Sequence, residues 1–270
     1  YRFLLSITLD LEDLGMPGTK AEAMIDWLIG QGAARAELSD LQRMEARRLM
    51  LRRGRDPLPD DPGLEDRMRR FLDHSPIFAV PNKKAAYELT HAVFYLSEYG
   101  RRDPQLGPDT VTSLIYAGIL AHLDLNADLL AEICVSLRYA GVMPPRMWED
   151  WIIRETRRFA VAEAGMATVG DAYHEYLVSS WACALAGQEV FTQVREGGAL
   201  RFDAPPRPQG PLREMSEALL HLGPVRCPDW EAMRGSVTAH MGEEAHAVLA
   251  AAEAATPEFA AFFSHFARAA

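Results

Sequence analysis

The chain has 270 residues, of which 49% are hydrophobic and 24% are charged, and this composition suits a globular protein with a sizeable core. Its formal net charge of −10 argues against a nucleic-acid partner or an anionic membrane surface, because both attract fields of lysine and arginine. No run of about 18 apolar residues is present, so the sequence predicts no membrane-spanning helix. The three cysteines, Cys134, Cys183 and Cys227, are far apart and are typical of a reduced, cytoplasmic protein.

The first part of the sequence predicts three helices and then a break. Apolar spacing predicts helices over 2–13, over 19–29 with Thr19 as the N-cap, and from Ser39 onwards. The third helix carries a basic run at Arg47, Arg48, Arg52 and Arg53, which we interpret as a solvated face. Residues 55–62 contain three prolines and three aspartates. They predict a boundary between an N-terminal helical cap, 1–60, and a main helical domain, 61–270, although one continuous domain fits as well.

The remaining chain repeats the same helical pattern. Predicted helices cover 64–72, 83–99, 109–123, 126–139, 145–163, 168–185, 212–222, 229–241, 243–254 and 257–270, with N-caps at Asn82, Asp109, Asn126 and Thr168. Residues 197–211 contain four prolines and predict a long surface loop. Because period-2 strand patterns are almost absent, the sequence predicts an all-α fold of about twelve helices. A multi-helix α/α hairpin array or partial toroid is favoured, with an irregular bundle as the alternative.

One predicted helix, 83–99, carries a polar stripe on an otherwise apolar surface. Glu88, His91, Tyr95 and Glu98 lie three or four residues apart and so share one face. A helix that is apolar around most of its girth is typical of a central position, where a polar stripe would line an internal cavity. The same spacing is also common on ordinary surfaces.

A second predicted helix, 168–185, offers a comparable set of side chains. Asp171 lies one turn before His174, so the acid could orient the imidazole as a base or as a metal ligand. Tyr173 and Trp181 are candidate substrate-binding residues on the same helix, together with Tyr95 of the first. A histidine near the helix start could equally be a surface residue.

Two further groups of residues are weaker candidates. His122, Asp124, Asp128 and Glu132 straddle a predicted helix–loop–helix junction, where first-turn acids also simply favour the helix dipole. Glu88-x-x-His91 and Glu243-x-x-His246 together suggest the ligand set of a di-iron carboxylate bundle. The sequence holds no G-x-S-x-G, G-x-G-x-x-G, P-loop or H-E-x-x-H motif.

Residues 87–100, YELTHAVFYLSEYG, and 173–181, YHEYLVSSW, carry a family resemblance. They resemble a poorly characterised actinobacterial family with "LTHxxFYLTDFG"-like and "YHxxLVxxW"-like segments. The resemblance covers roughly residues 80–190, and Ser97-Glu98-Tyr99 stands where the family has Thr-Asp-Phe. It implies an all-helical fold and a genomic place beside natural-product biosynthesis genes, but no particular reaction.

These observations leave three functional hypotheses. The first is a bacterial biosynthetic enzyme with a buried pocket, where His91, His174, Glu88, Glu98 and Asp171 perform acid–base or metal-assisted chemistry on a small metabolite. The second is a non-catalytic helical scaffold that binds a peptide or protein partner. The third is a di-iron carboxylate oxygenase. The sequence leaves the substrate, cofactor, metal and oligomeric state open.

Overall fold

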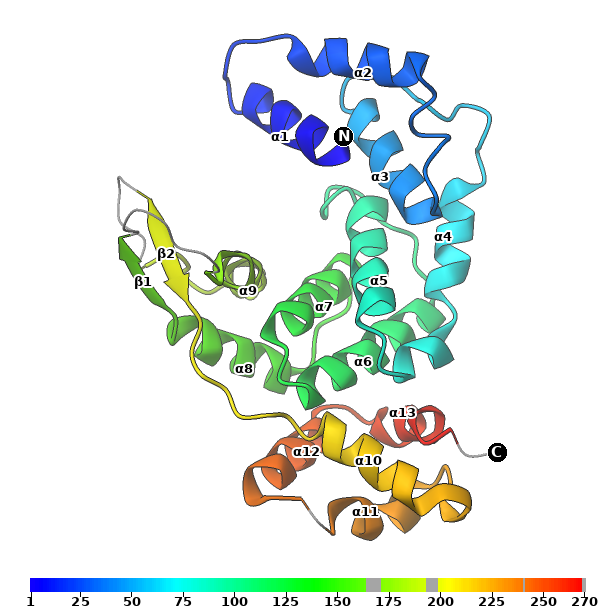
Figure 1. The fold of residues 1–270 in the computed structure, drawn as a ribbon, viewed down its shortest axis with the longest axis vertical. Helices are drawn as coiled ribbons and strands as arrows, with labels where there is room; N and C mark the ends of the chain where they lie inside the picture. Colours follow the sequence, from blue (N-terminus) through cyan, green and yellow to red (C-terminus); the bar gives the residue numbers. More distant parts are fainter. Residues whose placement is uncertain (164–170, 193–198, 240, 269–270) are drawn as a thin grey trace. The chain divides into compact units, whose positions relative to one another are not determined.

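The computed structural model describes residues 1–163, 171–192, 199–239 and 241–268. Its first helices are α1 (Arg2–Asp13), α2 (Lys20–Gly30), α3 (Asp40–Leu51), α4 (Leu64–Leu72), η1 (Ser75–Ala79), α5 (Lys83–Leu96), α6 (Pro108–Leu123), α7 (Ala127–Tyr139) and α8 (Arg146–Arg157). The remaining elements are β1 (Ala160–Glu163), α9 (Tyr173–Leu185), β2 (Leu200–Asp203), α10 (Leu212–Leu222), η2 (Gly223–Val225), α11 (Trp230–Thr238), α12 (Glu243–Ala255) and α13 (Phe259–Phe266). The thirteen α-helices in this part of the chain confirm the predicted all-α fold (Figure 1).

Three predicted capping residues, Ser39, Asn82 and Asn126, cap their helices, whereas Thr19 makes no side-chain hydrogen bond at the start of α2. Ser39 forms a capping box with Gln42 at the start of α3, and the Asn126 side chain accepts a hydrogen bond from the Leu129 amide at 3.1 Å at the start of α7. Asp109 was expected as a cap, but α6 already begins at Pro108, so Asp109 lies in its first turn. The cap expected at Thr168 lies outside the described residues.

Two short strands correct the predicted helix over 145–163 and the predicted loop over 197–211. Helix α8 ends at Arg157, and β1 then pairs antiparallel with β2, with Val161 opposite Phe202. Each strand has only four residues, too few to give a recognisable period-2 pattern. Phe202 stacks on Tyr176 of α9 with ring centroids 4.8 Å apart, so an aromatic contact holds the ribbon to that helix.

The chain divides by its internal packing into two compact units. Unit 1 comprises residues 1–72 and 91–104, and unit 2 comprises residues 73–90 and 105–270. Helix α5 therefore contributes its first part to unit 2 and its second part to unit 1. This division does not test the predicted domain boundary near residue 60, which stays a prediction.

Unit 1 has a small apolar core bordered by ion pairs. The buried core residues come from α1, α2 and α3: Leu5, Leu9, Ala21, Ile25, Leu28, Leu49 and Met50. The basic run on α3 is not a solvated face, because the side chains of Arg48, Arg52 and Arg53 are only 12%, 19% and 20% exposed and pair with carboxylates. Their aliphatic stems cover apolar surface while their guanidinium groups reach acids on neighbouring elements.

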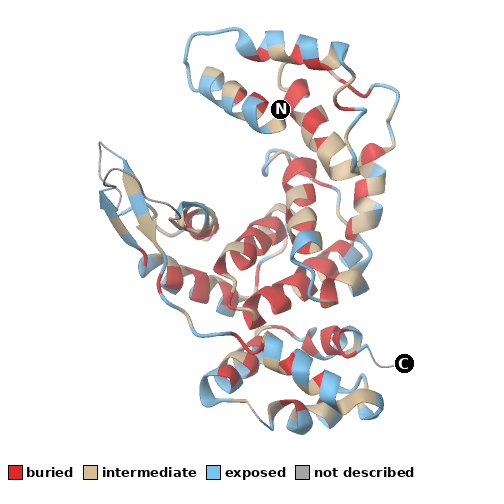
Figure 2. Cartoon of the chain, in the orientation of Figure 1, coloured by how far each residue is buried: buried red, intermediate tan, exposed pale blue. Residues whose placement is uncertain are grey.

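Unit 2 has a larger core that centres on α6 and α7. Figure 2 shows both helices buried over almost their whole length. Helix α7 packs against α6, α8 and α9. The approach of α8 to α6 requires Gly118, because a Cβ atom there would lie 2.3 Å from the Trp148 ring. Among the described residues, no helix combines the length and the apolar character that a bilayer crossing requires.

Candidate functional site

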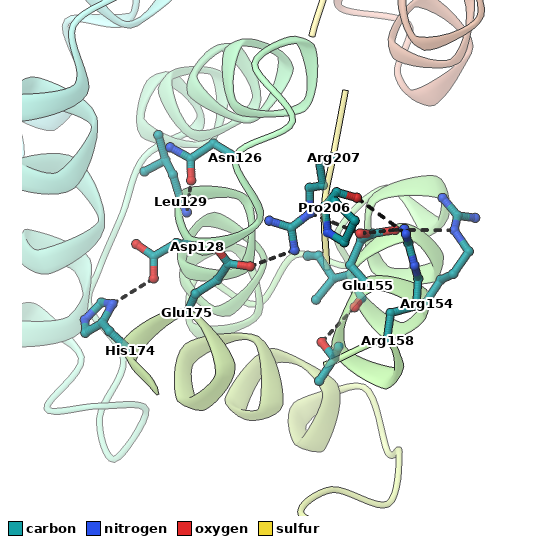
Figure 3. Close-up of polar contacts among 12 residues, drawn as sticks. Asn126, Asp128, Leu129, Arg154, Glu155, Arg158, His174, Glu175, Pro206 and Arg207 are labelled. Atoms are coloured by element: carbon teal, nitrogen blue, oxygen red, sulfur yellow. Dashed lines mark hydrogen bonds and ion pairs between the residues drawn. The ribbon is translucent and has the colours of Figure 1, made fainter. Parts of the chain in front are cut away.

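The most organised polar site in unit 2 centres on Asp128, in the first turn of α7. One carboxylate oxygen, Oδ1, lies 2.8 Å from Nδ1 of His174 on α9 (Figure 3). The other, Oδ2, accepts a hydrogen bond of 2.7 Å from the hydroxyl of Tyr87 on α5. Three helices therefore place one carboxylate, one imidazole and one phenol together.

Burial differs across these three side chains. The Asp128 side chain is 15% exposed, whereas that of His174 is 61% exposed. Burial, followed by the hydrogen bond and charge of Asp128, raises the pKa of Tyr87, so its phenol stays protonated and keeps donating. In neutral His174 the Nδ1 proton faces Asp128, which leaves Nε2 as the basic nitrogen on a ring open to solvent.

A second polar contact lies one turn deeper between the same two helices, α5 and α7. The Thr90 hydroxyl donates to Glu132 Oε2 at 2.5 Å, and Glu132 is only 2% exposed. Thr90 follows Tyr87 by three residues and Glu132 follows Asp128 by four, so each pair shares a helix face. The polar contacts therefore continue from the solvent-facing His174 inward to a buried carboxylate.

Arg207, in the segment between β2 and α10, organises the other side of α9. Its Nε donates to Glu155 Oε2 on α8 at 3.0 Å, and its Nη2 donates to Glu175 Oε1 on α9 at 2.7 Å (Figure 3). Burial alone would lower the pKa of Arg207, but the hydrogen bonds and charges of Glu175 and Glu155 outweigh it and raise that pKa. Because Glu175 follows His174 directly, Arg207 helps to fix the first turn of α9.

The path of that segment also depends on Gly210. A Cβ atom at this position would lie 2.1 Å from the carbonyl oxygen of Leu123 at the end of α6, so only glycine permits the close approach. The predicted loop over 197–211 is thus ordered where it carries Arg207. Its proline content predicted irregular backbone, but no sequence pattern indicated that Arg207 would bridge two helices.

The predicted residues of α5 do not share one environment. His91, Tyr95 and Glu98 belong to unit 1, where the His91 ring lies 6.0 Å from that of Phe94. Tyr95 is 8% exposed, and burial followed by the charge of Glu45 raises its pKa. Glu98 Oε2 lies 3.0 Å from Arg48 Nε. These contacts are the local packing of unit 1.

The predicted residue Glu88 belongs to unit 2, where it forms an ion pair with Lys84, one turn earlier on α5, at 2.5 Å. The Lys84 side chain is 81% exposed, so this pair lies at the surface. An ion pair at this spacing is common on helix surfaces and stabilises the helix only slightly.

The predicted residues at α9 also separate. Asp171 accepts hydrogen bonds from the backbone amides of Tyr173 and Phe202, both at 3.3 Å, so it ties the helix start to β2. Trp181 packs against Tyr139 with ring centroids 5.9 Å apart. Tyr173 is exposed and touches the His174 ring edge-on. The expectation of a buried pocket is wrong for His174, whose side chain protrudes into solvent.

The group at the α6–α7 junction separates as well. Asp124 pairs with Lys83 at 2.9 Å, while His122 is buried and packs its ring 6.1 Å from that of Trp151. Burial, together with the charge of Arg154, lowers the pKa of His122 to about 4. Only Asp128 and Glu132 of this group take part in the α5–α7 contacts. Within the described ranges, no three His, Cys, Asp or Glu side chains gather in a way that could hold a metal ion.

The fold and site define an all-helical protein with an oriented histidine at the junction of three helices. The family described as "Domain of unknown function (DUF6902)" matches residues 1–269. The chain belongs to this family. Searches of the curated proteins and of the solved structures gave no match.

Proposed function

We propose that this protein is an enzyme in which His174 transfers a proton to or from a small metabolite. The observation that supports this most directly is the pair of contacts at Asp128, which receives the Tyr87 hydroxyl and the Nδ1 side of a solvent-facing imidazole. A carboxylate in this position selects one tautomer of the imidazole and stabilises the imidazolium that forms on proton uptake. An isolated surface histidine has neither advantage.

Each residue has a distinct role in this proposal. His174 Nε2 takes or gives the proton, because its other ring nitrogen is engaged. Asp128 orients the ring, and Tyr87 keeps Asp128 from rotating. Arg207 and Glu175 hold the first turn of α9 in place, so they are positioning residues. The substrate class we propose is a small metabolite of natural-product biosynthesis, in keeping with the family resemblance of residues 80–190.

A direct test uses hydrolysis of p-nitrophenyl acetate as a general probe of histidine basicity. In this reaction His174 removes a proton from the water that attacks the ester carbonyl, p-nitrophenolate leaves with the electron pair of the broken bond, and the proton passes to solvent. We expect the second-order rate constant to fall about tenfold or more in His174→Gln and by a smaller factor in Asp128→Asn.

The matched control is His246→Gln. His246 is an exposed helical histidine that also follows a glutamate by three residues, but it has no carboxylate partner among the described residues. Its substitution should leave the rate unchanged. An unchanged rate in His174→Gln, with the folded state confirmed by circular dichroism, would contradict the proposal.

A second candidate function, a non-catalytic binding protein, is favoured by a different feature of unit 2. This is an apolar hollow beside α10 that none of the residues of the His174 site lines. The di-iron alternative finds no ligand group among the described residues, and we do not propose it.

A further inference from the structure

Unit 2 contains a cavity of about 320 Å³ between η1, the start of α5, α6, α7 and α10. Its walls are mainly apolar and include Phe78, Val80, Ala117, Leu120, Leu129 and Leu212. This volume lies in the range of small-molecule sites, which are mostly apolar and carry a few polar groups at defined places. Ser216 of α10 also lines this cavity.

A second hollow of about 320 Å³ continues from the first along α10. Both hollows are lined by Pro81 and Ser216, so they meet at these two residues. The second hollow extends past Leu219 and Leu220 to Phe266 of α13. From Leu212 to Leu220 the helix rises about 12 Å, at 1.5 Å per residue, so the two hollows form an elongated groove beside α10.

The charged residues of this groove are mostly basic, although the chain as a whole carries a net charge of −10. Lys83 and Arg213 line the first hollow with Asp124, and Arg226 and Arg268 line the second without an acid. Lys83 is neutralised by Asp124 at 2.9 Å and Arg213 by Glu217 at 2.8 Å.

The two arginines of the second hollow differ from these. In the part of the chain that the structure describes, the guanidinium groups of Arg226 and Arg268 have no carboxylate partner. Within the described ranges, positive charge without a paired carboxylate is thus at one end of the groove and the apolar cavity is at the other.

We propose that this groove binds a medium-chain aliphatic carboxylate, with its head group at Arg226 and Arg268 and its tail in the cavity beside Leu120. The apolar walls favour a hydrocarbon chain, because binding removes its apolar surface from water. The two guanidinium groups of the second hollow favour a carboxylate, with which arginine forms directional hydrogen bonds. The elongated shape favours a linear ligand over a compact one. The inference is independent of proton transfer at His174.

The experiment is a calorimetric titration of the whole chain with dodecanoate and, separately, with dodecanol. We expect saturable binding of dodecanoate, and binding of dodecanol that is about tenfold weaker. The double variant Arg226→Gln, Arg268→Gln should lower the affinity for dodecanoate about tenfold and leave that for dodecanol unchanged. Equal affinities for the acid and the alcohol in the wild-type protein would overturn the assignment of the head-group end.

A steric variant tests the path of the tail. Ser216 is exposed and lies where the two hollows meet, so Ser216→Trp should obstruct the groove without disturbing the core and should lower dodecanoate affinity about tenfold or more. The control is His221→Trp, at an exposed position on the same helix outside the groove, which should bind as the wild type does. Thermal unfolding shows whether both variants are folded.

Three results would refute the proposal. One is the absence of saturable binding to the wild-type protein, and another is unchanged binding in a folded Ser216→Trp variant. The third is concentration-dependent dimerisation that Ser216→Trp abolishes, because the groove would then be occupied by a second copy of the chain.

Discussion

Two arginines, one in each unit, pair with carboxylates in different surroundings. In unit 1, Arg52, directly after α3, reaches Asp10 and Asp13 of α1, whose side chains are 55% and 46% exposed. In unit 2, Arg207 reaches Glu155 and Glu175, whose side chains are only 5% and 21% exposed. The arginines themselves are similarly covered, at 19% and 14%. The contrast between these two clusters therefore lies in their acids, which face water around Arg52 and are enclosed around Arg207.

The enclosed acids around Arg207 belong to a wider set of buried ionisable side chains in unit 2. Among the described residues, the buried histidine and the two buried glutamates, His122, Glu132 and Glu155, all belong to unit 2. A buried ionisable group destabilises the fold unless it is paired, so it persists where the structure or function requires it. In unit 1 the charges border a small core and fasten helices at the surface. These buried groups are consistent with a functional site in unit 2, where Asp128 and His174 lie.

A matched pair of substitutions, Arg207→Met and Arg52→Met, tests whether enclosure of the acids matters. Methionine keeps much of the apolar stem but removes the charge. Arg207→Met leaves Glu155 enclosed with fewer partners, so we expect a loss of about 3 kcal/mol in the free energy of unfolding. Arg52→Met exposes two acids that water already solvates, so the loss should stay below about 1 kcal/mol. Urea denaturation monitored by circular dichroism measures both.

Equal losses in the two variants would show that enclosure of the acids does not matter. A loss for Arg207→Met that disappears in the double variant with Glu155→Gln would confirm the cause, because it identifies the stranded carboxylate as the source. The double variant therefore separates an uncompensated charge from simple loss of packing.

A smaller effect is expected from His122, the buried base of unit 2. Its Nδ1 has no hydrogen-bond partner among the described residues, and its pKa is lowered to about 4, against an ordinary value of 6.5. The unfolded chain therefore binds a proton between these pH values while the folded chain does not, so stability is lost as the pH falls through this window. Between pH 7 and pH 5 the loss from His122 should be about 2 kcal/mol.

The variant His122→Leu tests this contribution. It should remove that part of the pH dependence, so that the difference in unfolding free energy between wild type and variant shifts by about 2 kcal/mol from pH 7 to pH 5. His265→Gln, at an exposed histidine of α13, should leave the pH dependence as it is. A wild-type profile in His122→Leu would mean that His122 is protonated in the fold.

Much of the helical architecture could be predicted from local patterns. Ser39 and Asn126 cap helices where their side chains compete well for backbone amides, and this preference depends only on neighbouring residues. The β1–β2 ribbon could not be predicted, since it depends on the contact of Phe202 with Tyr176 from a separate element. Where contacts between distant elements determine the secondary structure of a short segment, the periodicity of that segment does not predict it.

The site shows the same limit more sharply. His174 was a candidate from the sequence, and Asp128 belonged to a weaker group, but their pairing spans 46 positions and depends on how α7 packs against α9. The local acid, Asp171, was the obvious partner from spacing, yet backbone amides occupy it. The spacings Tyr87–Thr90 and Asp128–Glu132 could have indicated the contact between α5 and α7, because each places two polar side chains on one helix face.

A smaller change in stability is expected from the turn that follows α5 in unit 1. Glu98 and Tyr99 have φ values of 48° and 56°, in the left-handed region that costs non-glycine residues about 1 kcal/mol each. Arg48 covers this turn: its guanidinium lies 4.5 Å from the centre of the Tyr99 ring, and its Nε lies 3.0 Å from Glu98 in an ion pair without hydrogen-bond geometry.

Arg48→Lys keeps the charge of this residue but loses the planar group that stacks on Tyr99, so we expect a loss of about 1 kcal/mol. The amide of Tyr99, which donates to the Phe94 carbonyl at 2.8 Å, should then exchange its hydrogen about fivefold faster. Arg43→Lys, at a surface pair with Asp40 on the same helix, should change neither quantity. If both variants show the same stability and exchange rate, the contact of Arg48 with Glu98 and Tyr99 contributes no more than an ordinary surface ion pair. If only Arg48→Lys loosens the turn, then the cation of Arg48 holds the strained backbone of this turn in position.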